Sequence, residues 1–294
     1  MTKKYEQFDN FFTGFKKLNI KDKEFIQFRM NNILKTTEFS SNHCFGVLNS
    51  MSNIATQYGI DLYNSNILEI GSGKYSLLTG LYWKYMNVKK YIGIDKFCNP
   101  FLSKDWEEMY KSKINLLPRI LGNKDLYEIL DNDSWNKLNE FIEIYKDDFL
   151  NIKLKENTFD FVYSSAVFEH IEKPEDTISA LYNVLKPGGL TYHNIDLRPH
   201  SAHKQNPIDI LRYSTTDWKA KTLNSYNWQY LNRLRSSDWI ELFETNGFEI
   251  LDVKIRKFEE VSTDDIYNHI DDEFKGYSLD VLNNAIVNIT ARKI

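Results

Sequence analysis

A short apolar run that ends in a glycine turn limits this chain to a small set of folds. Residues 66–76 read NILEIGSGKYS, so an apolar segment leads directly into two glycines that flank a serine. A helical pattern follows at 74–86, and a second short apolar run, YIGID, occupies 91–95. Strand, glycine turn, helix and strand in this order form a βαβ unit, which belongs to a parallel sheet. The chain is therefore predicted to adopt an α/β fold whose glycine turn faces a ligand.

Strands and helices continue to alternate towards the C-terminus. FDFVYSS at 159–165 is predicted to be a buried strand, PEDTISALYNVL at 174–185 a helix that starts with proline, and LTYHNIDL at 190–197 another strand. SSDWIELFETNGF at 236–248 has the serine start and glycine end of a helix, and the strands FEILDVKI and AIVNITARK follow it. Because no comparable helix pattern separates these last two strands, they predict an antiparallel edge on a mostly parallel sheet.

Three segments do not follow this alternation. Residues 1–60 show helical spacing and are predicted to form an N-terminal cap, and residues 98–146 predict a helical insertion after the second strand. Residues 199–235 are polar and aromatic and follow the strand at 190–197. The second and third segments come after the carboxyl ends of strands, where open α/β sheets hold their ligands, so both are candidate substrate walls. We predict one domain, 1–294, that carries all three.

Composition excludes several classes of protein. The chain has 294 residues, 42% apolar, which is enough for a full hydrophobic core. Its net charge of −4 gives no field that would attract nucleic acid. No apolar run approaches the roughly eighteen residues of a membrane span, and no signal sequence is evident, so a cytoplasmic location is expected. The two cysteines, Cys44 and Cys98, form no Cys-x-x-Cys pair, which argues against a disulfide scaffold or a thiolate metal site.

The glycine turn fits neither of the two common phosphate-binding loops. A P-loop needs Gly-x-x-x-x-Gly-Lys, and Gly71 and Lys74 do not have that spacing. A dinucleotide loop needs a third glycine where this chain has Ser76. A cofactor without phosphates needs glycine at the turn, for close approach of the backbone, and an acid for a ribose diol. Asp95, 24 residues after Gly71, supplies that acid at the end of the next strand.

The motifs LEIGSG, GID, FDFVYSSAVFEHI and LKPGGL resemble, in order and spacing, those of class I S-adenosylmethionine-dependent methyltransferases over about residues 66–196. The resemblance implies a Rossmann-like, seven-stranded, mostly parallel sheet with an antiparallel edge strand. In that family the glycine loop lies against methionine and ribose, the acid after the second strand binds the ribose hydroxyls, and an Asp-hydrophobe pair contacts adenine. Where the family often has a further glycine, this chain has Tyr75. The implied contacts to S-adenosylmethionine are Glu69, Gly71, Ser72, Gly73, Asp95, Asp148, Phe149 and Ser165.

No metal is expected. Some metal-assisted relatives bind magnesium at a Glu–His pair that corresponds to Glu169 and His170, but they carry another acid where this chain has Ala166. His170 is therefore expected to pack structurally. A zinc site among the residues 193–203 is not favoured, because the geometry of a strand scatters such side chains rather than bringing them together.

The segment where the strand at 190–197 leaves the sheet carries the candidate catalytic groups. HNIDLRPHSAH at 193–203 contains three histidines, and a hydroxyl acceptor needs a base to take its proton. The candidate bases are His200, Asp196 and His193, although a buried histidine in the core is an alternative for His193. Arginines and aromatics beyond this strand are candidate contacts to the acceptor, because guanidinium groups bind phosphate or carboxylate and aromatic rings accept sugar faces. These are Arg198, Arg212, Tyr213, Arg233 and Arg235.

The alternative for these arginines is a segment that packs its own aromatics and pairs its arginines with local acids. We expect an O-methyltransferase of a polar small molecule, carbohydrate-like or anionic, such as a sugar, nucleotide-sugar or phosphorylated glycan precursor. The patterns HxxDLxxH, LRYS and NRLRSxDW are similar to those of a bacterial subgroup associated with surface polysaccharides. An N-methyltransferase and a catalytically silent cofactor-binding subunit are alternatives, and a dehydrogenase is a more distant one. Homo-oligomerisation is left open.

Overall fold

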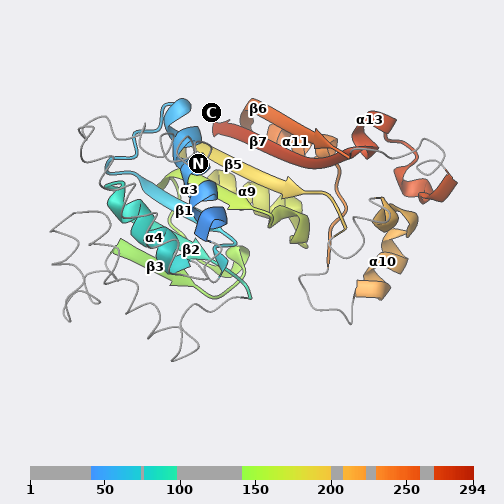
Figure 1. Ribbon diagram of the computed structural model, residues 1–294, viewed down its shortest axis with the longest axis horizontal. Helices are drawn as coiled ribbons and strands as arrows, with labels where there is room; N and C mark the ends of the chain where they lie inside the picture. The colour runs from blue at the N-terminus through green and yellow to red at the C-terminus, as the bar shows by residue number, and fades with distance from the viewer. Residues whose placement is uncertain (1–40, 74–75, 98–140, 200–207, 223–229, 259–267) are drawn as a thin grey trace, which may run out of the picture. The chain divides into compact units, whose positions relative to one another are not determined.

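The computed structural model describes residues 41–73, 76–97, 141–199, 208–222, 230–258 and 268–294 (Figure 1). The chain divides into two compact units, one up to Asp148 and one from Phe149. The division of 1–294 into a cap, an insertion and a substrate segment stays a prediction, because most of those residues lie outside the described ranges.

The first unit contains the βαβ motif predicted from the glycine turn. Its elements are helix α3 (Ser41–Gln57), strand β1 (Asn66–Ile70), helix α4 (Ser76–Tyr85), strand β2 (Lys90–Ile94) and strand β3 (Ile142–Tyr145). Strands β1 and β2 pair in parallel with Leu68 opposite Ile92, and β3 pairs in parallel with β2. Trp83 of α4 is fully buried, as are Ile67 and Leu68 of β1. A strand buried on both faces reads as an apolar run, which explains the NILEI pattern.

Residues 142–145 were expected to lie in the helical insertion but form strand β3 instead. The sequence IEIY is four residues long, and periodicity cannot separate so short a strand from a turn of helix. Its pairing with β2 therefore depends on tertiary structure and cannot be predicted from the local sequence.

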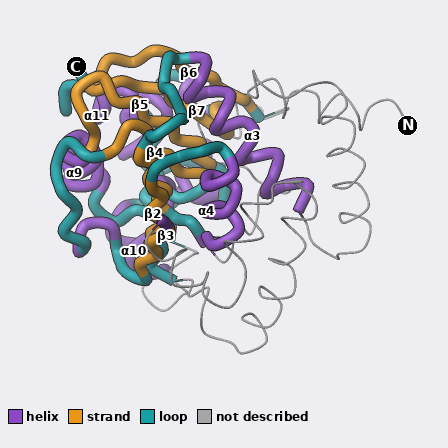
Figure 2. Tube along the Cα trace, turned by 90° about the vertical axis from the view of Figure 1, so that its left-hand side faces the viewer, coloured by secondary structure: helices purple, strands orange, loops and turns teal. Residues whose placement is uncertain are grey.

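The second unit continues the alternation. Its elements are η2 (Phe149–Asn151), β4 (Phe159–Ser165), η3 (Phe168–His170), α9 (Pro174–Val184), β5 (Leu185–Asp196), η4 (Asp209–Arg212), α10 (Thr215–Thr222), α11 (Ser236–Thr245), β6 (Phe248–Lys257), η6 (Asp272–Phe274), α13 (Leu279–Leu282) and β7 (Asn284–Lys293). Helices α9 and α11 lie side by side next to the strands of this unit (Figure 2). Gly247, with φ at +89°, ends α11 as its sequence position predicted.

The strands follow the order β3-β2-β1-β4-β5-β7-β6 in a seven-stranded sheet. Strand β4 pairs in parallel with β5, whereas β7 runs antiparallel to both β5 and β6. The predicted Rossmann-like class I methyltransferase fold, with a mostly parallel sheet and an antiparallel strand near one edge, is confirmed. The antiparallel strand is β7, which lies one position in from the outermost strand β6.

A second, smaller apolar core gathers in the C-terminal part of this unit. It joins η4, α10, η6 and α13 to the segment that precedes α11. Its buried members are Ile208, Ile210, Leu211, Trp218, Leu231, Ile270, Phe274 and Leu282. Five of these residues, Ile208, Ile210, Leu211, Trp218 and Leu231, belong to the predicted substrate segment, whose role stays a prediction.

Within the described residues, no helix is both long enough and apolar enough to cross a bilayer. The cytoplasmic location stays a prediction.

Candidate cofactor and acceptor site

The turn between β1 and α4 is bound to the end of β2. Gly71 has φ at +77° and Gly73 has φ at +59°, a left-handed conformation that glycine adopts readily. The amides of Gly71 and Ser72 both donate to the carbonyl of Ile94, at 2.7 and 3.0 Å. The two glycines therefore let the backbone turn back towards the carboxyl end of the neighbouring strand.

Asp95, the acid that follows β2, reaches the same turn. Its Oδ2 accepts a hydrogen bond from the amide of Gly73 at 2.8 Å, and its Oδ1 accepts from the amide of Phe97 at 2.9 Å. Its own amide donates to the carbonyl of Tyr145 at 3.0 Å. A carboxylate has about four acceptor directions, so bonds to backbone amides are compatible with hydroxyl donors from a ribose. The glycine turn and the acid thus meet at one place, as their spacing predicted.

Ser72 and Gly93 hold the turn close to β2. Ser72 is 6% exposed, and its Oγ lies 2.7 Å from Oγ of Ser76, which in turn donates to the carbonyl of Gly73 at 2.6 Å. A Cβ at Gly93 would lie 2.9 Å from Oγ of Ser72 and 2.8 Å from the hydroxyl of Tyr91. Glycine at position 93 is therefore required for this approach, a role that the sequence motifs did not reveal.

Two other predicted cofactor residues of this unit have polar partners. Glu69 accepts a hydrogen bond from the hydroxyl of Tyr91 at 2.5 Å, which joins β1 to β2. Asp148 forms an ion pair of 3.3 Å with Lys96, and about a third of its side chain is exposed. Their contacts to adenine or methionine stay predictions.

The turn fits a nucleoside ligand that brings no pyrophosphate. A Cβ at Gly73 would meet no heavy atom of the described residues within 4 Å. A neutral turn next to a carboxylate suits ribose hydroxyls and does not suit a phosphate.

In the second unit, strand β4 ends in an irregular turn. Ser165, the last residue of β4, is half-buried, and Ala166 has φ at +54°, a conformation that costs a non-glycine residue about 1–2 kcal/mol. The amide of Ala166 donates to the carbonyl of Asn194 on β5 at 2.9 Å, which holds the turn in place. Functional sites commonly store backbone strain of the kind found at Ala166. Phe149, the predicted adenine contact, is 7% exposed.

His193 is a buried core residue. Its side chain is inaccessible to solvent, with Nδ1 at 2.7 Å from Oγ of Ser164 and Nε2 at 2.6 Å from Oγ1 of Thr191. Its ring stacks on Phe168 with centroids 3.9 Å apart. Burial lowers the pKa of His193 to about 3. Burial and the two side-chain partners agree with the alternative of a buried core histidine, and the role of His193 as a base stays a prediction.

Asp196 and Arg198 are bound to each other. Arg198 donates from Nε to Oδ1 of Asp196 at 2.7 Å and from Nη2 to Oδ2 at 2.6 Å, a bidentate pair. This hydrogen bonding to Asp196 raises the pKa of Arg198. The sequence assigned these residues separate roles, base and substrate contact, and the structure joins them into one ion pair at the end of β5. His200 lies outside the described residues, so its role as a candidate base stays a prediction.

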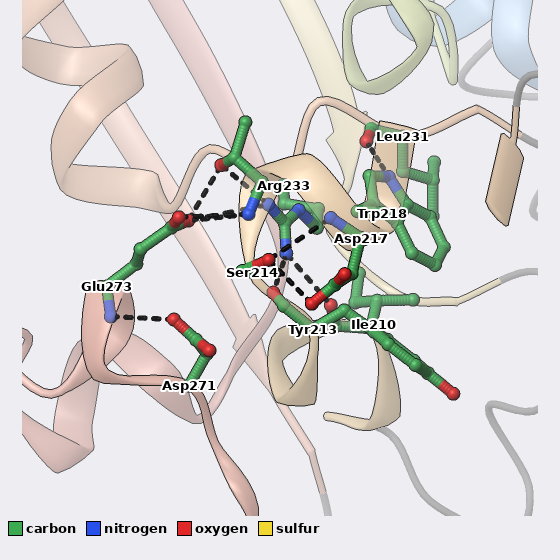
Figure 3. A network of polar contacts seen from close by, with 10 residues as sticks. Ile210, Tyr213, Ser214, Asp217, Trp218, Leu231, Arg233, Asp271 and Glu273 are labelled. Carbon is green, nitrogen blue, oxygen red and sulfur yellow. Dashed lines mark hydrogen bonds and ion pairs between the residues drawn. The ribbon is translucent and has the colours of Figure 1, made fainter. Parts of the chain in front are cut away.

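Arg233 lies in a network of polar contacts next to the small C-terminal core, as Figure 3 shows. It is 6% exposed and donates to the carbonyls of Tyr213 and of Ile210, the latter at 3.3 Å, and to Oγ1 of Thr215 at 2.9 Å. Its Nη2 also lies 3.6 Å from Glu273. The guanidinium thus bridges the backbone turn before α10. Its predicted contact to the acceptor stays a prediction.

Arg235 is likewise internal. It is 1% exposed and donates to the carbonyl of Asn284 at 2.8 Å. Burial lowers the pKa of Arg235 to about 10, so the group stays charged at neutral pH.

Arg212 is more exposed than Arg235. About half of its side chain is accessible, and it forms an ion pair of 3.0 Å with Asp209. Its guanidinium carbon lies 5.9 Å from the ring centroid of Tyr213. The predicted contacts of these arginines and of Tyr213 to the acceptor stay predictions.

Glu169 is a functional candidate that the sequence reading did not select. Its side chain is 2% exposed, and neither carboxylate oxygen has a hydrogen-bond partner among the described residues. Burial raises the pKa of Glu169 from 4.5 to about 8, against the pull of nearby backbone amides, and the negative charge of Asp196 adds to the increase while Arg198 opposes it. Buried acceptors without donors are rare and need an explanation.

The turn that carries Glu169 is clamped by the segment before α11. Asn232 donates from Nδ2 to the carbonyls of Phe168 at 2.7 Å and Ile171 at 3.1 Å. Its amide donates to the carbonyl of Glu169 at 2.8 Å. Nδ1 of His170 lies 2.7 Å from the carbonyl of Tyr230. Four hydrogen bonds therefore fix the backbone and one ring of this turn.

In the described part of the chain, no group of three or more metal-ligating side chains gathers. The prediction that the protein needs no metal is untested.

A glycine turn bonded to the acid at the end of the next parallel strand is typical of α/β proteins that bind a nucleoside. Residues 43–253, well over half of the chain, match a family model described as a methyltransferase domain. The chain belongs to this family, whose cofactor is S-adenosylmethionine.

Two curated relatives align with parts of the chain. The mitochondrial ubiquinone biosynthesis O-methyltransferase of Dictyostelium discoideum is 23% identical over 195 residues, which cover 66% of this chain and 53% of that protein. The sterol 24-C-methyltransferase of Saccharomyces cerevisiae is 39% identical over 72 residues, which cover 24% of this chain and 18% of that protein. The alignments thus span about half of the first relative and less than a fifth of the second.

Solved structures of methyltransferases are also similar. An S-adenosylmethionine-dependent methyltransferase from Mesorhizobium loti superposes with a TM-score of 0.46 and 14% identity over 82% of this chain and 96% of that one. Phosphoethanolamine N-methyltransferase 2 of Haemonchus contortus, solved with S-adenosylhomocysteine, gives a TM-score of 0.45 and 16% identity over 83% of this chain and 52% of that one.

Proposed function

We propose that the protein is an S-adenosylmethionine-dependent methyltransferase that methylates an oxygen atom of a polar small molecule. The observation that supports this activity best is the hydrogen bond of 2.8 Å between the amide of Gly73 and Oδ2 of Asp95. It brings together the two parts of the chain that a nucleoside needs, a glycine turn and a carboxylate. Membership of the methyltransferase-domain family supplies the identity of the nucleoside.

In this proposal the cofactor supplies a methyl group on a positively charged sulfur. Gly71, Ser72 and Gly73 present backbone to the cofactor, and Asp95 accepts hydrogen bonds from the ribose hydroxyls. Glu69, Asp148, Phe149 and Ser165 are proposed as further contacts, from the positions of the family motifs. Methyl transfer is an in-line displacement, so the protein accelerates it chiefly by aligning the acceptor with the methyl group.

The acceptor is proposed to be a sugar, a nucleotide-sugar or a phosphorylated precursor of a surface glycan. Arg212 and Tyr213 support an anionic or carbohydrate-like group, because an arginine that is about half exposed lies beside an aromatic ring. Transfer to oxygen agrees with the activity named for the Dictyostelium relative, although the partial alignment leaves the acceptor open.

Calorimetry with S-adenosylmethionine and S-adenosylhomocysteine tests the cofactor, and transfer of a labelled methyl group to a panel of acceptors tests the reaction. The panel contains UDP-glucose, glucose 1-phosphate, 3,4-dihydroxybenzoate and phosphoethanolamine. We expect binding of both nucleosides and transfer to a hydroxyl compound. Binding without transfer to any compound would favour a silent subunit, transfer to phosphoethanolamine alone would favour N-methylation, and no binding would contradict the proposal.

A further inference from the structure

The turn after β4, residues 166–171, contains two features that cost free energy. Ala166 adopts φ of +54°, which is unfavourable for a residue with a side chain. Glu169 is 2% exposed, and neither carboxylate oxygen has a hydrogen-bond partner among the described residues. Such features persist where the surrounding structure holds a functional conformation in place. Ser165, the proposed cofactor contact at the end of β4, directly precedes this turn.

A connector of four residues, 230–233, joins this turn to the small C-terminal core. The carbonyl of Tyr230 lies 2.7 Å from Nδ1 of His170, which belongs to the turn. The carbonyl of the next residue, Leu231, accepts a hydrogen bond of 2.7 Å from Nε1 of Trp218, which belongs to the small core. Consecutive residues of the connector are therefore bound to different parts of this unit.

The last two residues of the connector continue this alternation. Asn232 donates from Nδ2 to the carbonyls of Phe168 at 2.7 Å and Ile171 at 3.1 Å. Its backbone amide donates to the carbonyl of Glu169 at 2.8 Å. Arg233, with φ at +66°, donates instead to the backbone before α10. The turn and the small core are therefore held together through two adjacent residues.

The side-chain amide of Asn232 has one orientation that satisfies its neighbours. Its Oδ1 accepts a hydrogen bond from the amide of Leu234 at 3.2 Å, so Nδ2 faces the two carbonyls of the turn. A carbonyl oxygen only accepts, so both contacts need hydrogens on the side chain. An ionised aspartate has the same shape and supplies no hydrogen. The contacts therefore depend on the donor of this side chain and not on its size.

We propose that Asn232 is a positioning residue of the methyl transfer, which holds the turn after β4 in the conformation that the cofactor requires. This inference rests on the proposed function, because Ser165 is a cofactor contact in that proposal. Asn232 itself touches neither the cofactor nor the acceptor. Its hydrogen bonds offset the unfavourable conformation at Ala166, so the backbone next to Ser165 is ordered before the cofactor binds. Binding then costs less conformational entropy, and the affinity is higher.

The test uses Asn232→Asp, which replaces the donor by an acceptor and keeps the size of the side chain. Asn246→Asp is the matched control, since Asn246 is also half-buried and donates from Nδ2 to the carbonyl of Leu242 at 2.8 Å. Both changes lower the stability, which urea unfolding measures. Calorimetry with S-adenosylhomocysteine at pH 7.5 measures cofactor binding. We expect the dissociation constant to increase about tenfold in Asn232→Asp and to keep its wild-type value in Asn246→Asp.

The pH dependence distinguishes a missing donor from a general loss of structure. The new carboxyl group regains a hydrogen when it is protonated, and it then donates to the carbonyl of Phe168. The two carbonyl oxygens disfavour its charged form, so protonation occurs at a higher pH than for an exposed aspartate. We therefore expect the ratio of the variant and wild-type dissociation constants to decrease from pH 7.5 to pH 5.5. The ionisable groups around the turn are present in both proteins, so the ratio cancels their contribution; they are Glu169, His170, Glu172, Asp196, Arg198 and Arg233.

Amide exchange measured by mass spectrometry locates the effect in the free protein. We expect faster exchange at 166–171 in Asn232→Asp and wild-type exchange there in Asn246→Asp. If Asn232→Asp does not fold, Asn232→Ala takes its place, because it removes the donor without adding a charge. Its dissociation constant should then exceed the wild-type value at both pH values, without recovery at pH 5.5.

Three results would overturn the inference. They are equal dissociation constants for wild type and the variants at position 232, an increase of the same size in Asn246→Asp, and a ratio for Asn232→Asp that does not change with pH. In each case the wild type still binds S-adenosylhomocysteine, so the proposed function stands and only the role of Asn232 is removed. If the wild type binds no S-adenosylhomocysteine, the proposed function fails and the inference fails with it.

Discussion

The amide of Gly73 and the carboxylate of Asp95 are joined by a hydrogen bond of 2.8 Å across 22 positions of sequence. The bond connects the turn after the first strand to the end of the second strand. Since the same carboxylate is proposed to hold the ribose, the shape of the turn and the affinity for the cofactor depend on one side chain.

Asp95→Ala removes both interactions. We expect S-adenosylmethionine to bind at least tenfold more weakly, because a hydrogen bond to a charged group contributes about 1.5–3 kcal/mol. Calorimetry measures the change, and Asp160→Ala, at an acid of β4 paired with Lys186, is the matched control. Unchanged affinity in Asp95→Ala would contradict the role of this carboxylate.

Gly93→Ala tests the packing of the turn against β2. The new methyl group would lie 2.9 Å from Oγ of Ser72 and would push the buried serine away. Overpacking of this kind costs about 1–3 kcal/mol of stability, and we expect weaker cofactor binding as well. Gly276→Ala is the control, since a Cβ there meets nothing within 4 Å. Equal melting temperatures and affinities for the two variants would show that the turn does not need the close approach.

Arg233→Lys tests whether this arginine supports the fold or binds the acceptor. A single ammonium cannot reproduce the bonds to Ile210, Tyr213 and Thr215, so we expect a loss of about 1–3 kcal/mol in stability. Amide exchange should become faster in 208–222. The exposed Arg212→Lys should leave both unchanged. A raised acceptor KM at unchanged stability would support the predicted substrate role instead.

The fold and the cofactor turn could be predicted because their signals are local. Gly71, Gly73 and Asp95 are read from one βαβ unit, in which the order of strand, turn and helix fixes where the chain must return. The antiparallel end could be read from two strands that no long helix separates. Strand β3 was missed because four residues do not establish a period.

The chemistry around the acceptor was less predictable because the partners lie far apart in sequence. Arg235 bonds to the carbonyl of Asn284, 49 positions away, so nothing near it indicates a structural role. Asn232 clamps the turn of Glu169 from more than 60 positions away. One sequence signal for Glu169 was present, because this acid lies among mostly apolar residues in AVFEHI, residues 166–171.

His193 should make the protein sensitive to acid. Burial lowers the pKa of His193 to about 3 from an ordinary 6.5. Between these two pH values the ring is protonated in the unfolded chain and neutral in the folded chain. The stability from the neutral ring is therefore complete above pH 6.5 and decreases as the pH falls, by about 1.4 kcal/mol per pH unit. Urea unfolding at pH 7.5 and 5.5 measures the decrease, and His193→Gln, although less stable, should lack this contribution. An equal slope in the variant would mean that other groups cause it.

Glu169 should act in the opposite direction. Its pKa is raised from 4.5 to about 8, so the folded chain holds a proton that the unfolded chain releases between these values. The contribution to stability is complete below about pH 4.5 and is lost as the pH rises towards 8, again by about 1.4 kcal/mol per pH unit. Glu169→Gln keeps the shape and removes the titration. We therefore expect the variant to gain stability relative to wild type between pH 6 and pH 8, measured by urea unfolding, with Glu175→Gln as the control. Because His193 opposes this trend below pH 6.5, the difference between Glu169→Gln and wild type is the quantity that decides. A difference that does not change with pH would mean that the carboxylate is already ionised and partnered in the folded protein.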